Sequence, residues 1–276
     1  MQKAIISILA KYLNVLNIIS KRVGSRHAFF VFCYPIPVQL KPAQLKFINT
    51  SRQGFFDFAG KKVATYEWGS GPEVILFLHG WQSQTYRWKK FIETLDKEKY
   101  TLLSIDAPAH GNSEGKILYL PLYANLIERL MAEYSPDYIL AHSMGAFSSL
   151  ALFYEKPKLS PKKMALLGTP GEVTEFVEEY ARVLKISDRV KKNLSDYFIQ
   201  LMGHGAEYYS AKKFATKQLA QGLIIHDEGD KDAPFRHGLA VHKNWPNSEM
   251  YVTKGLGHKL RSIDVVHKVE EFFARD

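Results

Sequence analysis

The sequence predicts an α/β fold with a mainly parallel central sheet and helices on both of its faces. From about residue 54, short apolar runs rich in branched residues recur along the chain, a pattern typical of strands that are buried on both sides. Segments with the apolar spacing of helices lie between these runs, and such alternation predicts a parallel sheet. The chain has 276 residues, 46% of them hydrophobic, which is enough to bury one large core.

Eight strands and five helices follow from this pattern. The first two strands form a leading pair, and the others alternate with helices. The strands are predicted at 54–58, 61–69, 73–80, 100–108, 137–143, 163–170, 222–230 and 249–258. The helices are predicted at about 85–97, 119–134, 144–155, 235–243 and 262–274.

Residues 172–217 interrupt the alternation, because they carry no strand pattern and have the spacing of two or three helices. The segment is too long for a simple crossover, so we expect a helical insertion that lies over the strand ends as a lid. Most of its apolar side chains are expected to pack against the core, and a few to line an apolar pocket. These side chains are Phe176, Tyr180, Val183, Leu184, Tyr197, Phe198, Leu201, Met202, Tyr208 and Tyr209.

The N-terminal arm, residues 1–53, precedes the predicted domain at 54–276. The first 23 residues have apolar positions every three to four residues, which predicts an amphipathic helix. Two interpretations stay open: the helix packs its apolar stripe on the body of the protein, or residues 1–26 contact an anionic membrane surface. The stripe is formed by Ile5, Leu9, Leu13 or Tyr12, Leu16 and Ile19. Prolines at 35, 37 and 42 predict an extended connection into the body.

The charge distribution argues against a nucleic-acid partner. The whole net charge of +9 lies in residues 1–62, which contain ten Lys or Arg and one acid, Asp57, whereas the remainder holds 27 basic and 27 acidic residues. A nucleic-acid enzyme more often carries its positive field around the active cleft. No apolar run is long enough to predict a membrane-spanning helix. A single cysteine, Cys33, cannot form an intramolecular disulfide, and a reducing, cytoplasmic location is the natural interpretation, with a disulfide-free secreted enzyme as the alternative.

The strongest functional motif is AHSMG at residues 141–145, because ligands bind beyond the carboxyl ends of parallel strands. The strand ends in the small residue Ala141, the nucleophile candidate Ser143 follows, and Gly145 leads into a helix. A sharp strand-to-helix turn exposes its central side chain and needs small neighbours. The helix N-terminus that follows favours developing negative charge.

With these residues the chain resembles the α/β-hydrolase superfamily over about residues 54–276. The pattern of the family's nucleophile elbow is G-x-S-x-G, and Ala141 replaces its first glycine with another small residue. The family's order along the chain is nucleophile, acid, histidine. Ser143 is likewise followed by Asp230 and His258, each near the end of a predicted strand. The resemblance implies a triad in which Ser143 attacks, His258 transfers its proton and Asp230 orients the imidazole.

The resemblance also implies an oxyanion hole made of two backbone N–H groups. One belongs to Met144, directly after the nucleophile, and the other to Trp81, directly after His79 and Gly80. His79 is expected to hold this loop. His110 lies in a segment similar to the family's D-x-P-G-H-G-x-S and is expected to shape a turn.

Three other polar residues near these motifs have competing interpretations. Asp227 and Asp232 are alternatives to Asp230 as the triad acid, and the loop position favours Asp230. His142 is expected to form a structural hydrogen bond rather than to act as a base. The acids around Asp230 lack the order of a calcium loop, and strand alternation points them in different directions. Neither a metal nor a cofactor is therefore expected.

Together these features predict a metal-independent serine hydrolase, a carboxylesterase in the simplest case, acting on an ester or thioester with an apolar group. Carbon–carbon bond hydrolases, acyltransferases and cofactor-free haloperoxidases share the serine triad and stay as alternatives. A hydrolase-like protein that only binds its ligand is a further alternative. Relatives that use an aspartate nucleophile are excluded by Ser143. The sequence predicts neither the natural substrate nor the oligomeric state.

Overall fold

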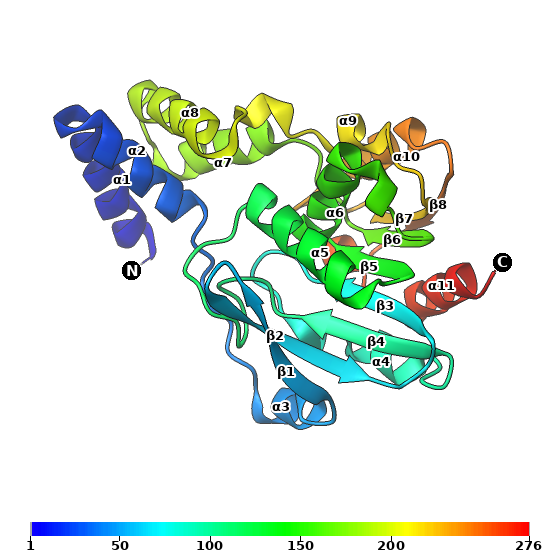
Figure 1. The fold of residues 1–276 in the computed structure, drawn as a ribbon. Coiled ribbons are helices and arrows are strands. Elements are labelled where there is room, and N and C mark those ends of the chain that lie inside the picture. The colour runs from blue at the N-terminus through cyan, green and yellow to red at the C-terminus, as the bar shows by residue number, and fades with distance from the viewer. Residues whose placement is uncertain (1, 276) are drawn as a thin grey trace. The chain divides into compact units, whose positions relative to one another are not determined.

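The computed structural model describes residues 2–275, with side chains from Ile5 onward. The chain forms two compact units, whose elements are labelled in Figure 1. The sheet unit comprises Pro35–Gly171 and the chain from Ala211 onward. The helical unit comprises the chain up to Tyr34 and the segment Glu172–Ser210.

The sheet unit contains an eight-stranded sheet with the order β1-β2-β4-β3-β5-β6-β7-β8. β1 pairs with β2, and β2 with β4, in antiparallel register, while every other neighbouring pair is parallel. This arrangement confirms the predicted fold class. The strands are β1 (Arg52–Phe58), β2 (Lys61–Trp68), β3 (Glu73–Leu78), β4 (Tyr100–Ile105), β5 (Tyr138–His142), β6 (Lys163–Leu167), β7 (Gln221–Asp227) and β8 (Ser248–Thr253).

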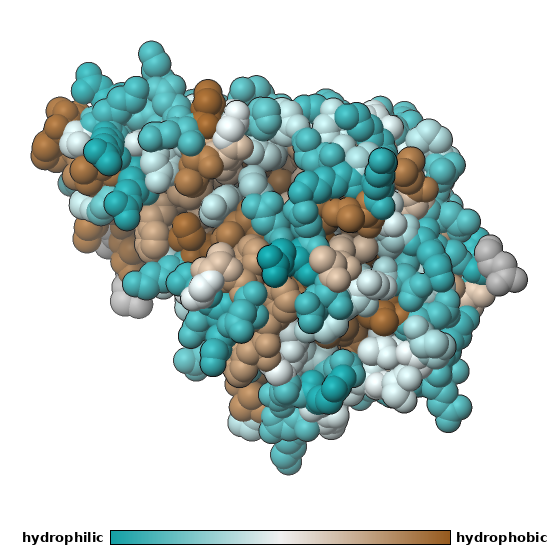
Figure 2. Space-filling view, in the orientation of Figure 1, coloured by the Kyte–Doolittle hydropathy of each residue, from teal (hydrophilic) through white to brown (hydrophobic). Residues whose placement is uncertain are grey.

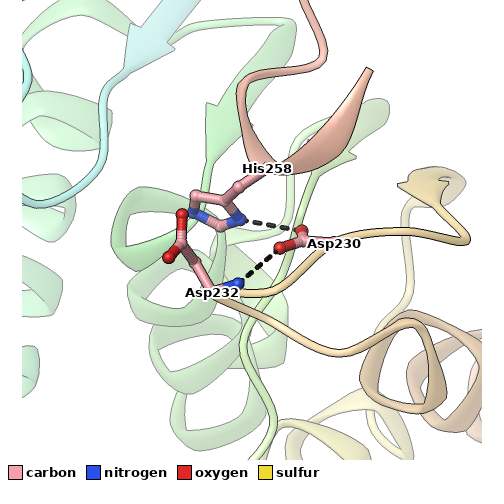
Figure 3. A group of neighbouring side chains, drawn as sticks. All are labelled: Asp230, Asp232 and His258. Carbon is pink, nitrogen blue, oxygen red and sulfur yellow. Dashed lines mark hydrogen bonds and ion pairs between the residues drawn. The ribbon is translucent and has the colours of Figure 1, made fainter. Parts of the chain in front are cut away.

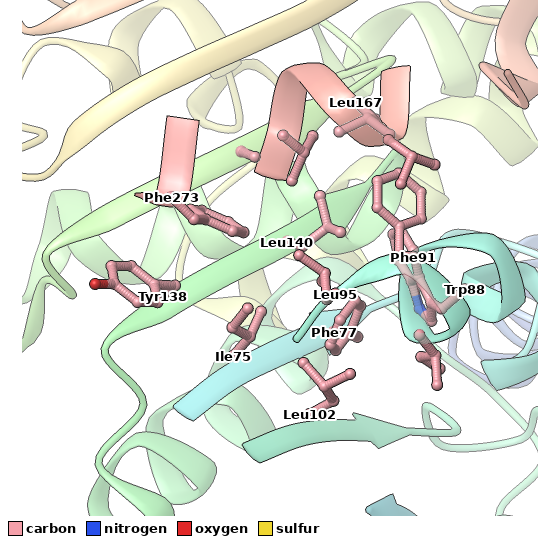
Figure 4. Close-up of a cluster of buried hydrophobic side chains, with 14 of the residues drawn as sticks. Ile75, Phe77, Trp88, Phe91, Leu95, Leu102, Tyr138, Leu140, Leu167 and Phe273 are labelled. Carbon is pink, nitrogen blue, oxygen red and sulfur yellow. The ribbon is translucent and has the colours of Figure 1, made fainter. Parts of the chain in front are cut away.

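Helices cover both faces of this sheet (Figure 1). One face carries α4 (Lys89–Thr94) and α11 (Ile263–Ala274), and the other carries α5 (Leu120–Tyr134), α6 (Met144–Glu155), α9 (Ala211–Ala215) and α10 (Phe235–Asn244). Alternate strand residues point to the same face, so every second side chain of the central strands contributes to the core under α4 and α11. Figure 4 shows part of this core. Its labelled members are Ile75, Phe77, Trp88, Phe91, Leu95, Leu102, Tyr138, Leu140, Leu167 and Phe273.

A short helix, α3 (Pro42–Ile48), lies where the sequence analysis predicted only an extended connection. Proline is well accommodated in the first turn of a helix, where its missing N–H has no intrahelical partner. The side chain of Gln44 accepts a hydrogen bond from the backbone N–H of Lys41 (2.7 Å) and so closes this turn. Ile48 is buried in the sheet unit's core. The prediction was wrong because it treated Pro42 as a breaker rather than as a first helical residue.

The helical unit contains α1 (Gln2–Ile19), α2 (Lys21–Phe32), α7 (Val173–Leu184) and α8 (Asp188–Met202). The single amphipathic helix predicted for the first 23 residues is two helices. Ser20 separates them, because its backbone is extended and its side chain accepts a hydrogen bond from the N–H of Val23. Serine is among the preferred residues for capping a helix N-terminus in this way. No helix among residues 2–275 combines the length and the apolar character needed to cross a bilayer.

Asn17 joins α1 to the insertion in the interior of the helical unit. Its Oδ1 accepts a hydrogen bond from Nδ2 of Asn193 on α8 (3.1 Å), and both side chains are buried. Gly24 of α2 approaches the same residue so closely that a Cβ at position 24 would lie 2.5 Å from the Asn17 Cγ. An ion pair between Lys21 and Asp196 (2.8 Å) links α2 to α8 at the surface.

The buried side of α1 differs from the predicted apolar stripe. Leu13 of that stripe is buried, but Ile5 and Ile19 are exposed, and Asn17 is buried in their place. The spacing failed here because α1 has apolar residues nearly all round, so apolarity alone does not define which side packs.

Three aromatic residues of the insertion also pack inside the helical unit. Tyr197 and Phe198 contact the ring of Phe29, and Tyr180 contacts the ring of Phe32. The Tyr180 hydroxyl in addition donates to the carbonyl oxygen of Ala28 (2.9 Å). The sequence analysis expected such residues to pack against the core or to line a pocket. These three side chains pack against α2 instead.

Candidate active site

The nucleophile candidate Ser143 lies in the sharp turn between β5 and α6. Its backbone has a φ of 51°, a conformation that non-glycine residues seldom adopt, and such strain is concentrated at functional sites. Its N–H donates to the carbonyl oxygen of Leu167 on β6 (2.9 Å), which fixes the turn against the sheet. A Cβ at Gly145 would lie 2.4 Å from the carbonyl oxygen of Leu78. The small residue that the motif predicted at this position is therefore required by close packing.

His258 lies between Ser143 and Asp230 and contacts both. Its Nδ1 is 2.8 Å from Asp230 Oδ2, and its Nε2 is 3.0 Å from Ser143 Oγ. An ionised carboxylate can only accept, so the Nδ1 proton points to Asp230 and Nε2 accepts from the Ser143 hydroxyl. The sequence placed these three side chains at separate strand ends, and the structure brings them together. Asp227, the last residue of β7 and one of the two alternatives for the triad acid, does not contact the His258 ring.

Asp230 is fixed in a buried loop after β7. Its Oδ1 accepts hydrogen bonds from the backbone N–H groups of Asp232 and Ala233, both at 2.9 Å. Burial alone raises the pKa of a carboxyl group. For Asp230, hydrogen bonds from His226, His258 and Ala233 outweigh burial and hold its pKa well below the ordinary range. The carboxylate consequently stays ionised opposite the imidazole.

The loop that carries His258 is held by Asp227, which has a different role from the one considered for it. Asp227 Oδ2 accepts hydrogen bonds from the hydroxyl of Thr253 (2.8 Å) and the backbone N–H of Leu256 (2.9 Å). Burial raises the pKa of Asp227, but hydrogen bonds from these backbone and hydroxyl donors lower it by more, so the net shift is downward. Asp227 thereby ties the end of β8 and the histidine loop to the end of β7.

His142 supports the same loop from the nucleophile side, as the sequence analysis expected. Its Nε2 donates to the carbonyl oxygen of His258 (2.8 Å), and the two imidazole rings lie 4.7 Å apart. Burial, followed by the nearby positive charge of Arg87, lowers the pKa of His142 well below its ordinary value. His142 is therefore neutral and acts as a hydrogen-bond donor to the loop.

The loop after β3 carries the predicted oxyanion residue Trp81. His79 holds it: Nδ1 donates to the carbonyl oxygen of Gly80 (2.7 Å), and Nε2 accepts from the backbone N–H of Ala107 (2.8 Å). Burial, helped by the neighbouring His110, lowers the pKa of His79 well below its ordinary value, which matches this neutral form. Gly80 faces the nucleophile, since a Cβ there would lie 2.7 Å from the Ser143 Cβ.

Among residues 2–275, neither the N–H of Trp81 nor that of Met144 donates a hydrogen bond to another residue. Met144 is the first residue of α6, where N–H groups have no partner within the helix. The two donors belong to the loop next to Gly80 and to the residue after Ser143.

Asp106, at the end of β4, is a positioning residue that the sequence analysis missed. Its carboxylate accepts from the N–H of Thr85 (2.8 Å), the N–H of Asn112 (3.0 Å) and the hydroxyl of Tyr66 (2.8 Å). It therefore joins the loop after Trp81 to the turn after β4. His110 reinforces this link, because its Nε2 accepts from the backbone N–H of Gln82 (3.0 Å). The sequence analysis placed Asp106 within the strand predicted at 100–108, and the signal that could have found it is its place as the first residue of the family-like segment that contains His110.

One group among the described residues has donor atoms close enough to hold a metal ion. Asp230, Asp232 and His258 each offer an atom within 4.8 Å of the others (Figure 3). In the structure, however, the atoms of Asp230 and His258 bond to each other, and the second Asp230 oxygen accepts backbone N–H groups. These bonds are the ones a proton-transfer triad uses.

The fold and this arrangement define an α/β-hydrolase. A family model described as "Serine aminopeptidase, S33" matches residues 71–228, more than half of the chain. The chain belongs to this family, and the matched residues run from the loop before β3 to the end of β7.

Three known proteins illustrate the similarity. An uncharacterised hydrolase, YugF from Bacillus subtilis, is 22% identical over 230 residues, which is 68% of this chain and 84% of the relative. A 2-hydroxy-6-oxononadienedioate/2-hydroxy-6-oxononatrienedioate hydrolase from Dechloromonas aromatica is 22% identical over 69% of this chain and 82% of the relative. The structure of Est1E from Butyrivibrio proteoclasticus with ferulic acid bound aligns with a TM-score of 0.62, at 18% identity, over 80% of this chain and 97% of that one.

Proposed function

We propose that this protein is a serine hydrolase that cleaves a carboxylic ester or thioester of a small molecule. The observation that carries the proposal is the continuous hydrogen-bonded path from Ser143 Oγ through His258 to Asp230. A serine hydroxyl is a weak nucleophile by itself, and an adjacent neutral imidazole with an accepting nitrogen activates it. The strained turn at Ser143 adds support, because it presents the hydroxyl at the strand end.

The proposed reaction proceeds in two halves. Ser143 Oγ attacks the substrate's carbonyl carbon while His258 Nε2 takes the hydroxyl proton. The resulting imidazolium is stabilised by the Asp230 carboxylate. His258 then gives the proton to the departing alcohol or thiol, and the acyl group stays on Ser143. A water molecule, deprotonated by the same nitrogen, attacks this acyl-enzyme, so that the acid leaves and Ser143 regains its proton.

The negative oxygen that forms in each half needs hydrogen-bond donors. We assign this role to the backbone N–H groups of Trp81 and Met144, which have no other acceptor among the described residues. The N-terminus of α6 adds its partial positive charge at the same place. Loss of one such donor typically lowers the rate by about 10²–10³-fold.

The substrate class rests on the reaction type and on similarity. Hydrolysis is the activity named for the two sequence relatives described above, and an ester with an apolar acyl or aromatic group is the substrate that we propose. A cytoplasmic location is part of the proposal, since the one cysteine, Cys33, is buried and unpaired. A second candidate is hydrolysis of a carbon–carbon bond next to a ketone, favoured by the relative from Dechloromonas aromatica named for such dienedioate substrates.

A fluorophosphonate probe tests the proposal, because it reacts only with an activated serine. We expect the wild-type protein to be labelled and the Ser143→Ala variant to be unlabelled. We expect Ser143→Ala to lose about 10⁶-fold in the rate of p-nitrophenyl ester hydrolysis. The matched control is Ser149→Ala, which removes a buried hydroxyl of α6 that bonds Gly145 inside the helix.

The same assay separates the alternatives. A panel of p-nitrophenyl esters, acyl thioesters, p-nitroanilides and a 2-hydroxy-6-keto-dienoate distinguishes an esterase from a carbon–carbon hydrolase. Labelling of Ser143→Ala at the wild-type rate would contradict the proposal. An unlabelled wild-type protein that binds esters without turnover would instead identify a non-catalytic binding protein of this fold.

A further inference from the structure

α1 exposes an apolar face to solvent. Five side chains on this face, each more than half exposed, are Ile5, Ile8, Val15, Ile18 and Ile19. A helix on the surface of a globular protein normally presents polar residues on its outer side. Contiguous exposed apolar surface marks a place where another molecule binds. Figure 2 shows apolar side chains gathered over the N-terminal helices.

This face is held in place by the helical unit and is not a loose end of the chain. The opposite side of α1 is packed, with Ala10, Leu13 and Asn17 buried. Asn14, near the same side, donates to the carbonyl oxygen of Lys185 (3.3 Å) and accepts from the N–H of Ser187 (2.8 Å). The exposed apolar residues of this fixed helix run from Ile5 to Ile19, which is about 21 Å along the helix axis.

Positive charge accompanies the face. Lys11 lies on the exposed side of α1, and Arg22 and Arg26 lie on the exposed side of α2. None of the three forms an ion pair with a described residue, whereas Lys21 is already paired with Asp196. The chain before Asp57 contains no Asp or Glu, so α1 and α2 supply no negative charge of their own.

Two exposed aromatic side chains lie near the C-terminal end of α2. Phe30 and Tyr34 are exposed, and their rings lie 5.5 Å apart. Amphipathic rings such as that of tyrosine favour the boundary between a bilayer's apolar interior and its headgroups. Isoleucines, arginines and exposed aromatics on one pair of helices form the combination that binds in the plane of an anionic membrane.

The charges also decide between a membrane and a second copy of the chain. A symmetric dimer through α1 would bring the same surface of both copies together. It would then bring together two surfaces that each carry Lys11, Arg22 and Arg26, with no acid on α1 or α2 to pair with these cations. A lipid surface with negative headgroups accepts both the apolar side chains and the cations.

We propose that the exposed face of α1, together with Lys11, Arg22 and Arg26, binds the surface of an anionic membrane with α1 parallel to it. This docking surface attaches the helical unit to the bilayer without crossing it. It is independent of the hydrolytic reaction, because it uses no residue of the candidate active site.

Cosedimentation of the full-length protein with lipid vesicles tests the proposal. We expect binding to phosphatidylcholine vesicles that contain phosphatidylglycerol, weaker binding to phosphatidylcholine alone, and loss of binding at high salt. The double variant Ile8→Glu with Val15→Glu should lower the vesicle affinity at least tenfold, since it puts two charges into the apolar face. Its control is Leu219→Glu, which charges a similarly exposed apolar residue of the sheet unit.

A second set of variants tests the charges. A triple variant should bind anionic vesicles more weakly, with the affinity lowered about fivefold or more for each cation replaced. It combines Lys11→Glu, Arg22→Glu and Arg26→Glu. The triple control Lys90→Glu, Lys116→Glu and Lys158→Glu changes the net charge equally on the exposed surface of the sheet unit. We expect this control to retain most of the binding. Circular dichroism checks that every variant is folded.

Three outcomes would overturn the proposal. The wild-type protein fails to bind anionic vesicles, or the α1 variants bind as well as their controls. In the third, sedimentation velocity finds a dimer that Ile8→Glu with Val15→Glu dissociates, and no vesicle binding accompanies it. The Ser143→Ala variant should bind vesicles like the wild type. Failure of docking is therefore distinguishable from failure of the proposed hydrolase activity.

Discussion

The two units of this protein use buried polar residues for different purposes. In the sheet unit, charged and polar side chains are buried and bonded to one another at the strand ends, as His258 is to Asp230 and Asp227 is to Thr253. In the helical unit, polar groups such as Asn17 join helices, and large apolar side chains point outward from α1. The comparison teaches that the proposed proton transfer and the proposed membrane attachment use different residues of one chain, so each can be tested without the other.

After the loss already expected for Ser143→Ala, the largest effect concerns two carboxylates at the end of β7. Asp230→Asn leaves an amide opposite the Nδ1 proton of His258, and the analogous change in serine triads lowers kcat by about 10⁴-fold. Asp227→Asn keeps the hydrogen bond between Asp230 and the His258 ring but disturbs the loop that carries His258. We therefore expect a much smaller loss of kcat, accompanied by lower stability. Ester hydrolysis and urea unfolding of both variants measure these effects. Equal losses of kcat for the two variants would contradict the assignment of Asp230, rather than Asp227, as the triad acid.

The next effect is the pH dependence of stability in the sheet unit. Burial lowers the pKa of His142, so its unfolded form binds a proton below about pH 6.5 while its folded form does not. Stability conferred by the neutral ring is thus present above pH 6.5 and declines as the pH falls. His142→Gln keeps a donor for the loop and removes the titration. We expect its unfolding free energy to fall less steeply below pH 6.5, by up to about 1.4 kcal/mol per pH unit.

Urea unfolding at several pH values between 7 and 5 provides this measurement. Identical slopes for wild type and His142→Gln would mean that the imidazole takes up its proton in the folded protein.

A smaller effect is expected in the helical unit. Asn17→Ala leaves the buried amide of Asn193 without its acceptor, which costs about 1–3 kcal/mol. Because α1 and α2 lie outside the candidate site, kcat for a water-soluble ester should not change. Hydrogen exchange, followed for α1 and α8, should report faster opening there and unchanged protection in β5 and β7. Faster opening in both units would show that they unfold together.

Much of the sheet unit was predictable, because its strands are buried on both faces and read as continuous apolar runs. The parallel sheet places successive strand ends at one edge, so Ser143, Asp230 and His258 could be located as loop residues from their order in the chain. The convergence of the three side chains depends on loop conformation. That conformation is fixed by buried hydrogen bonds, such as those of Asp106 and Asp227, which have no periodic pattern in the sequence.

The helical unit was harder to predict for a physical reason. Apolar periodicity identifies the buried side of a helix only when the other side is polar. α1 is apolar on both sides, so the predicted stripe matches the buried side only in part and does not include the buried Asn17. Its partner, Asn193, is 176 residues away along the chain. A contact of this separation leaves no trace in local spacing.

The helical unit joins two segments that are separated by the whole stretch from Pro35 to Gly171. During synthesis the ribosome completes α1 and α2 long before it reaches α7 and α8. At roughly 5–20 residues per second, this interval lasts on the order of ten seconds. The nascent α1 therefore waits with the apolar residues on both of its sides exposed. Early capture by a chaperone or a lipid surface would protect it from aggregation over that time.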